Sequence, residues 1–135
     1  MAYPINQLDG IDDETAKALK AAGIRTSEKL LEAAKDTKGR KALAARTGLS
    51  EKRLLKWANA ADRMRIKGMG REYAELMSEA GVKTIRDLKH RNAERLAAAM
   101  AEANRKRRRV KTPPSVKSVS RWVELAKKLP LKISY

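Results

Sequence analysis

The chain contains an internal repeat that limits how it can fold. Residues 8–31 (LDGIDDETAKALKAAGIRTSEKLL) align without gaps with residues 66–89 (IKGMGREYAELMSEAGVKTIRDLK), at a constant spacing of 58. Seven of the paired positions carry the same residue in both copies: Gly10 and Gly68, Glu14 and Glu72, Ala16 and Ala74, Ala22 and Ala80, Gly23 and Gly81, Thr26 and Thr84, and Leu30 and Leu88. Such self-similarity indicates a structural unit that the chain builds twice.

A second pair of similar segments extends the repeat. Residues 50–61 align with residues 115–126 at a spacing of 65, and this alignment matches Trp57 with Trp122. The spacing grows by seven because the later copy carries the insertion NRKRRRVKTPPS. We therefore predict a duplicated unit of about 60 residues, with copies at 8–65 and 66–129 in domains 1–65 and 66–135 that pack as one compact body.

The composition favours helices throughout. Alanine dominates, phenylalanine is absent, and β-branched residues never form the alternating run that a half-buried strand requires. The expected fold class is all-α, with an aliphatic core anchored by the two tryptophans. Glycines, hydroxyl residues and prolines bound the expected helices, which are 13–22, 27–35, 38–47, 51–65, 71–80, 85–91, 93–104 and 115–129.

The charge of the chain points to a polyanionic partner. Thirty-two Lys and Arg against sixteen Asp and Glu give a net charge of +16. With no cysteine and one histidine, His90, the chain lacks the residues for a disulfide framework, a thiolate site or a histidine cluster. No Ser-His-Asp set, paired-carboxylate site or Gly-rich phosphate motif with lysine is present. The sequence thus predicts a protein that is not an enzyme and needs no cofactor or metal.

The N-terminal residues MAYPINQLDG lack the basic and then apolar run of a signal peptide. No apolar stretch approaches the roughly 18 residues that a membrane-spanning helix needs. We therefore expect a cytoplasmic protein that does not enter a membrane.

Two glycines stand immediately before an expected helix rather than after one. Gly68 and Gly70 lie between Lys67 and Arg71, in a turn whose apolar residues, including Met69, are expected to point inward. Glycine permits backbone angles that other residues avoid, and it adds no side-chain bulk outside the turn. The first amides of a helix lack intrahelical partners and carry a partial positive charge, so they can receive a phosphate oxygen. The two cations would steer and hold that phosphate.

The same segment resembles the helix-hairpin-helix motif. In that motif an apolar residue, any residue, glycine, an apolar residue and glycine are followed by three residues and an alanine. The corresponding residues here are Ile66, Lys67, Gly68, Met69, Gly70 and Ala74. The resemblance implies that the hairpin amides hold the sugar-phosphate backbone of double-stranded DNA without reading sequence, and it places the protein on the nucleoid. The duplicated layout, over residues 4–135, is also similar to an uncharacterised bacterial domain family of tandem helix-hairpin-helix units.

The first copy departs from this motif. LDGIDDETA keeps Leu8, Gly10 and Ile11, but Asp12 stands where the second copy has Gly70. A carboxylate at a helix N-terminus occupies the amides that a phosphate would use. We therefore expect the first hairpin to be structural and the second hairpin to bind DNA.

Residues 104–111 (NRKRRRVK), here called the basic segment, hold six cations, and the prolines of the following TPP stop a helix from continuing. From residue 103 onward there are eleven cations and one anion, so the positive charge is concentrated near the C-terminus. We expect a flexible or newly ordered arm that follows DNA phosphates. Its contact residues would be Arg105, Lys106, Arg107, Arg108, Arg109 and Lys111.

Two alternatives remain open. Residues 40–59 have the spacing of a helix-turn-helix, with Gly48 at the turn, and Ser50, Glu51, Lys52 and Lys56 would then reach base edges of a preferred sequence. The recurrence of Trp57 as Trp122 favours an inward anchor over this interpretation. The second alternative is a protein-interaction or RNA-binding module, with RNA or an acidic protein as the partner.

Overall fold

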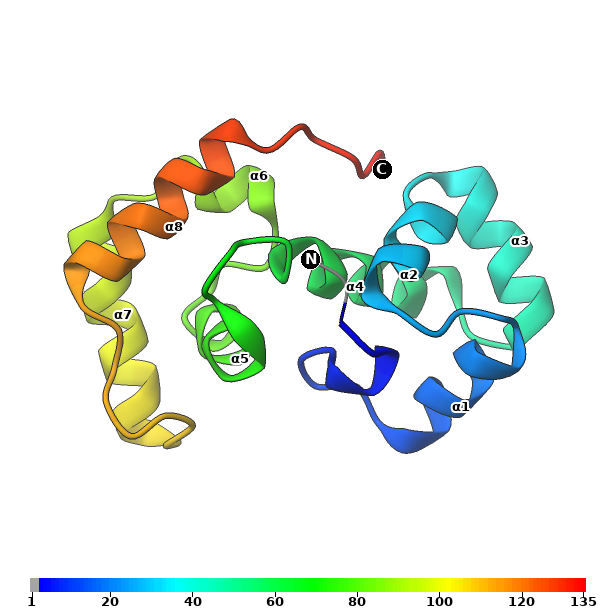
Figure 1. Cartoon of the computed structure of the whole chain (residues 1–135), viewed down its shortest axis with the longest axis horizontal. Helices are drawn as coiled ribbons and strands as arrows, with labels where there is room; N and C mark the ends of the chain where they lie inside the picture. The colour runs from blue at the N-terminus through cyan, green and yellow to red at the C-terminus, as the bar shows by residue number, and fades with distance from the viewer. Residues whose placement is uncertain (1–2) are drawn as a thin grey trace. The chain divides into compact units, whose positions relative to one another are not determined.

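The computed structural model describes residues 3–135, and every regular element in that range is helical (Figure 1). The all-α fold class is thus confirmed for the described residues. The elements are η1 (Ile5–Gln7, a 3₁₀ helix), α1 (Asp13–Ala21), α2 (Ser27–Ala34), α3 (Thr37–Thr47), α4 (Glu51–Arg63), α5 (Gly70–Glu79), α6 (Ile85–Leu88), α7 (Ala93–Lys106) and α8 (Val116–Lys128).

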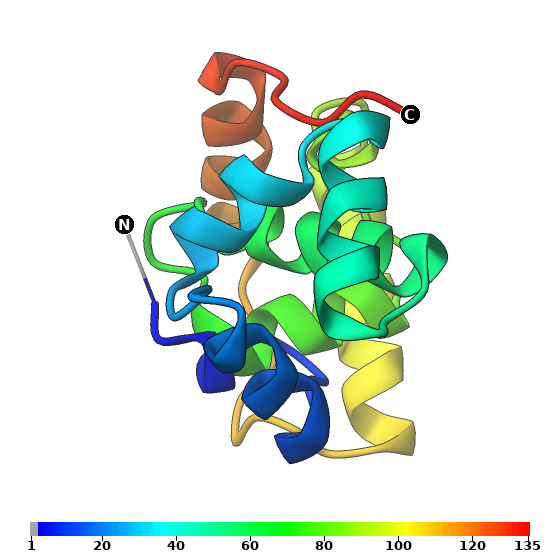
Figure 2. The same cartoon turned by 90° about the vertical axis from the view of Figure 1, so that its right-hand side faces the viewer.

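The chain forms two compact units. The first contains the described residues up to Arg65 together with Lys132–Tyr135, and the second contains Ile66–Leu131. The last four residues therefore differ from the expected domain 66–135. They join the first unit because the Ser134 amide donates to the Lys35 carbonyl at 2.8 Å and the Arg40 guanidinium donates to the Ser134 carbonyl at 2.7 Å. Figures 1 and 2 both show this C-terminal tail ending beside the start of α3.

In the first unit, α2 and α3 pack against α4. Leu54 and Trp57 of α4 are buried, and so is every residue from Ala58 to Arg63. A buried ion pair also lies in this unit, because the Arg63 guanidinium donates to the carboxylate of Asp9. The apolar face of α4 therefore organises the core, while Asp9 fixes the segment before α1 onto the end of α4.

In the second unit, α7 packs against α8, α5 against α7, and α6 against α8. Trp122 of α8 is buried and its ring lies 5.3 Å from that of Tyr73 on α5, a distance typical of a tilted aromatic contact. Both Trp57 and Trp122 are thus core anchors, as the sequence predicted, and their faces are not open platforms for bases.

Three helices end two or three residues from the predicted position. α4 stops at Arg63 instead of residue 65. α6 stops at Leu88 instead of residue 91, since the next residues form a tighter turn in which the Arg91 amide donates to the Leu88 carbonyl, and Asn92 then caps α7. α7 runs to Lys106 instead of residue 104. Arg105 and Lys106 suit its last turn, where cations interact favourably with the helix dipole.

None of the helices in the described part of the chain is long and apolar enough to cross a membrane.

Candidate nucleic-acid interface

The connection between α4 and α5 contains the second hairpin, residues 66–71. Ile66 and Met69 are buried at 1% and 2% exposure, and the Met69 amide donates to the Ile66 carbonyl at 3.2 Å. Lys67 and Gly68, which lie between them, are exposed. The two apolar residues therefore point inward, as the sequence predicted, and the residues between them face solvent.

The two glycines of this hairpin are required by the backbone. Gly68 has a φ of +85° and Gly70 a φ of +70°, both in the left-handed region that L side chains rarely adopt. A Cβ atom at either position would meet nothing within 4 Å. The space outside both glycines is thus open, and the conformation, not crowding, selects glycine.

The first turn of α5 has no side-chain cap. The residue at its N-cap position is Met69, which makes no side-chain capping hydrogen bond. The two cations beside this turn differ from one another. Lys67 is exposed and makes no ion pair among the described residues, whereas Arg71 donates from Nε to Glu75 Oε1 at 3.2 Å and is 36% exposed. The hairpin therefore presents one open cation and one that is partly neutralised.

The first hairpin, residues 8–13, is organised differently at two positions. Asp12 is the N-cap of α1, and its carboxylate accepts a hydrogen bond from the Thr15 amide at 2.7 Å. Its φ of −91° contrasts with +70° at Gly70, so the two backbones diverge at this position. Asp9, at the position equivalent to Lys67, is buried against Arg63 and does not lie on the surface. A carboxylate therefore already occupies the N-terminus of α1.

The basic segment is not a free arm. Its first two cations, Arg105 and Lys106, belong to α7, and Arg105 pairs with Glu102 at 2.6 Å. The buried side chain of Asn104 closes the turn that follows, because its Oδ1 accepts from the amides of Arg109 (2.8 Å) and Val110 (3.1 Å). Its Nδ2 donates to the Val110 carbonyl at 3.1 Å. The arm expected from the sequence is therefore a closed loop that is fixed by one asparagine.

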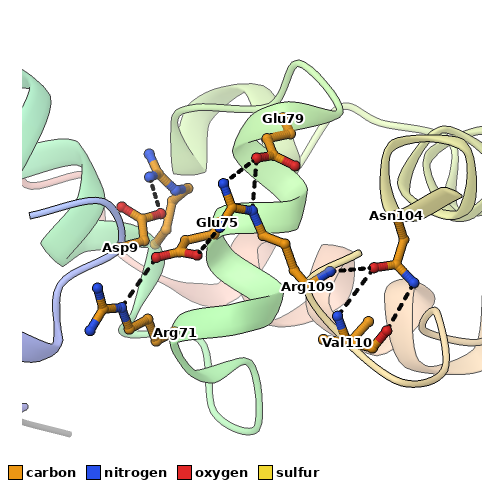
Figure 3. Close-up of polar contacts among 8 residues, drawn as sticks. Asp9, Arg71, Glu75, Glu79, Asn104, Arg109 and Val110 are labelled. Atoms are coloured by element: carbon orange, nitrogen blue, oxygen red, sulfur yellow. Dashed lines mark hydrogen bonds and ion pairs between the residues drawn. The ribbon is translucent and has the colours of Figure 1, made fainter. Parts of the chain in front are cut away.

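Arg109 points toward α5 and pairs with two of its carboxylates. Its Nη1 donates to Glu75 Oε2 at 2.8 Å and its Nε donates to Glu79 Oε1 at 2.7 Å, with a second contact from Nη2 to the same Glu79 oxygen (Figure 3). Only 24% of its side chain is exposed. The guanidinium is thus engaged by two carboxylates of the same chain, and its phosphate contact stays a prediction that these ion pairs do not favour. Lys106, Arg107, Arg108 and Lys111 are exposed.

Sequence reasoning missed Glu75, Glu79 and Asn104. Glu75 and Glu79 are four residues apart and so share one face of α5, which was the available signal. Their partner lies 34 and 30 residues further along the chain, and no local pattern identifies it.

The helix-turn-helix alternative concerns α3 and α4. Ser50 caps α4 by accepting from the Arg53 amide at 3.1 Å, so its hydroxyl is already used. Glu51, Lys52 and Lys56 are exposed, and the Lys56 ammonium lies 4.9 Å above the Trp57 ring. The start of α4 thus faces solvent, while its second half is core.

Among the residues that the structure describes, no group of three or more His, Cys, Asp or Glu side chains is arranged to hold a metal ion.

Comparison with known families gives one match. The model of the family described as Domain of unknown function (DUF4332) matches residues 9–129. Neither a curated protein nor a solved structure matches the chain.

Proposed function

The chain belongs to the DUF4332 family, and from its own residues we propose that it binds double-stranded DNA through the phosphate backbone, with little sequence preference. The observation that carries this proposal is the second hairpin. Its exposed Lys67 and Gly68 precede a helix whose first turn has no side-chain cap, in a chain with a net charge of +16. Amides at the start of a helix and a flanking lysine together form an environment that favours a phosphate oxygen.

The charge of the two units supports a DNA site in the second. Residues 66–131 contain seventeen Lys and Arg against seven Asp and Glu, a net charge of +10, and the first unit has the remaining +6. Exposed cations of the basic segment belong to this same unit, and we assign Lys106, Arg107, Arg108 and Lys111 to a wider phosphate footprint. Arg105 is shared with Glu102, and Arg109 is left out of the contact set.

We also propose that the two units derive from one duplicated helix-hairpin-helix unit. The helix bounds support this: α4 and α8 each have 13 residues and are related by the repeat spacing of 65. Positive φ angles recur at equivalent glycines, at Gly10 (+71°) and Gly68 (+85°). In this proposal the first copy has become structural through Asp9 and Asp12, while the second has kept the phosphate-binding hairpin. A protein of this kind would act in the cytoplasm, on the nucleoid.

A salt-dependent titration tests the proposal. If the complex neutralises about five phosphates, a plot of log K against log salt has a slope near −4.5 on B-DNA, and it is the same for two unrelated duplexes. No binding to either duplex contradicts the proposal. A strong preference for one duplex favours the helix-turn-helix of α3 and α4. Tighter binding to duplex RNA or to an acidic polypeptide favours the module alternatives.

A further inference from the structure

Arg109 is the most heavily engaged cation of the basic segment. It reaches from the loop after α7 to two carboxylates of α5, which lie one turn apart on that helix (Figure 3). The Glu75 side chain is largely shielded, at 15% exposed, and the Glu79 side chain is 27% exposed. A planar guanidinium that bridges two carboxylates, one of them shielded, fixes geometry more strongly than a single solvated surface pair does.

Glu75 also links the basic segment to the second hairpin. Its Oε1 accepts from Arg71 at 3.2 Å, and its Oε2 accepts from Arg109 at 2.8 Å. Arg71 belongs to the hairpin, so one carboxylate connects both groups of residues that the proposed function assigns to DNA. Asn104 completes the arrangement, because its side chain holds the backbone on either side of the Arg109–Val110 peptide.

We propose that Arg109, Glu75, Glu79 and Asn104 are positioning residues, which fix the basic segment against α5 so that its exposed cations and the hairpin form one phosphate-binding surface. This inference rests on the proposed function. Arg107 and Arg108 are exposed on the segment that these four residues hold, and Lys67 lies in the hairpin from which α5 starts. An ordered segment loses less conformational freedom on binding than a free arm, so fixing it in advance raises affinity without any new contact.

Charge-conserving substitutions separate position from charge. Arg109→Lys keeps the net charge but cannot reproduce the fork that reaches both carboxylates. We expect it to weaken duplex DNA binding about three- to tenfold, because the basic segment would then lose conformational freedom when it binds. The matched control is Arg95→Lys, which changes an exposed guanidinium on α7 outside the proposed contact set and should leave the affinity within about twofold.

Neutralising a glutamate separates an effect of net charge from loss of the Arg109 anchor, because the two predict opposite changes in DNA affinity. Glu79→Gln raises the net charge by one, so a role of charge alone predicts tighter DNA binding, whereas loss of the Arg109 anchor predicts binding weaker by about threefold or more. Glu72→Gln is the control. Glu72 is exposed on the same helix and raises the charge equally, and this variant should bind DNA as tightly as the unmodified protein or more tightly.

Hydrogen exchange of backbone amides measures, in the absence of DNA, whether the Arg109 anchor holds the basic segment. The amides of Arg109 and Val110 donate to Asn104, so they should be protected in the unmodified protein and lose protection in Arg109→Lys and Glu79→Gln. If these variants lose protection yet bind DNA normally, the anchor is only structural and the inference fails. It also fails if Arg109→Lys and Arg95→Lys have the same effect on DNA affinity. If the unmodified protein binds no DNA, the proposed function fails as well, and the wild-type titration identifies that case.

Discussion

Asp9 and Lys67 occupy equivalent positions of the repeat and have opposite surroundings. Asp9 is buried with its carboxylate on the Arg63 guanidinium, whereas Lys67 is exposed in the second hairpin. The residue equivalent to Arg63 in the second copy is Lys128, which is exposed as well. The aligned positions therefore hold an internal ion pair in the first unit and two surface cations in the second.

This contrast predicts that alanine substitutions at Asp9 and Lys67 have different effects, the first on stability and the second on DNA binding. Asp9→Ala leaves the buried Arg63 charge without its carboxylate and should lower the free energy of unfolding by about 3–5 kcal/mol. Urea denaturation followed by circular dichroism measures that loss. A change below about 0.5 kcal/mol, which is typical of surface sites, would mean that the ion pair does not hold the segment before α1.

Lys67→Ala should change DNA binding and leave folding intact. Loss of one phosphate contact should flatten the salt slope by roughly 0.9 and weaken all duplexes alike. The free energy of unfolding should stay within about 0.5 kcal/mol of the wild type, because Lys67 is exposed. An unchanged slope would remove Lys67 from the DNA interface.

Two substitutions of Gly70, to Asp and to Asn, test the effect of charge in the second hairpin while the backbone strain stays similar. Asn and Asp tolerate the left-handed region better than other L residues, and they differ here only in charge. Gly70→Asp should bind DNA about tenfold or more weakly than Gly70→Asn, because it places an anion where the phosphate is expected. Equal affinities of the two variants, measured by fluorescence anisotropy, would show that no phosphate approaches this position.

Individual residues were predictable where local chemistry decides their environment. The glycines of the second hairpin follow from turn geometry, and the inward orientation of the two tryptophans follows from their recurrence in the repeat. Arg109 was not predictable. Its surroundings depend on Glu75 and Glu79, which the fold brings close across about thirty residues of chain.

At the scale of elements, the two hairpins differ in how the helix that follows each of them is capped. The carboxylate of Asp12 caps α1, and hydrogen bonding to Thr15 holds the pKa of Asp12 below its usual value of 3.8. A lowered pKa means that the ionised form stabilises the fold above that usual value. The stabilisation disappears as the pH falls through the lower pKa of the folded protein.

Asp12→Asn isolates this charge, because asparagine is also a good N-cap. The wild type should be more stable than Asp12→Asn at about pH 7, and this difference in stability should shrink as the pH falls through the lowered pKa of the folded Asp12 carboxyl. Urea midpoints across this pH range measure it, and a difference that does not depend on pH contradicts the assignment. DNA affinity should stay unchanged or rise slightly, since a negative charge is removed from the first hairpin.

Most helix bounds could also be predicted, since hydroxyl caps and left-handed glycines punctuate the chain. Thr26, Ser50 and Thr84 each cap the helix expected after them, and Ser115, expected as the first residue of its helix, caps α8. The ends of α6 and α7 were predicted less well. There the chain closes through a tight turn or through the Asn104 side chain, and neither has a strong local signal.

At the scale of the whole molecule, the net charge of +16 is divided unequally between the units. Sequence alone predicted this asymmetry, but it did not predict that Lys132–Tyr135 would pack with the first unit. That packing depends on buried Arg40, whose guanidinium donates to the carbonyls of Ala34 and Ser134. The second unit is therefore completed at Leu131, and its positive surface is built without the C-terminal tail.

The central claim is that the backbone amides of the second hairpin receive a phosphate of duplex DNA. Amide chemical-shift mapping by NMR during a DNA titration tests it directly, since each hairpin reports separately. We expect the largest amide shift changes at residues 67–71 and at the exposed cations of the basic segment, while the amide shifts of residues 9–13 stay unchanged. Shifts confined to the first turns of α4, with the second hairpin silent, would contradict it.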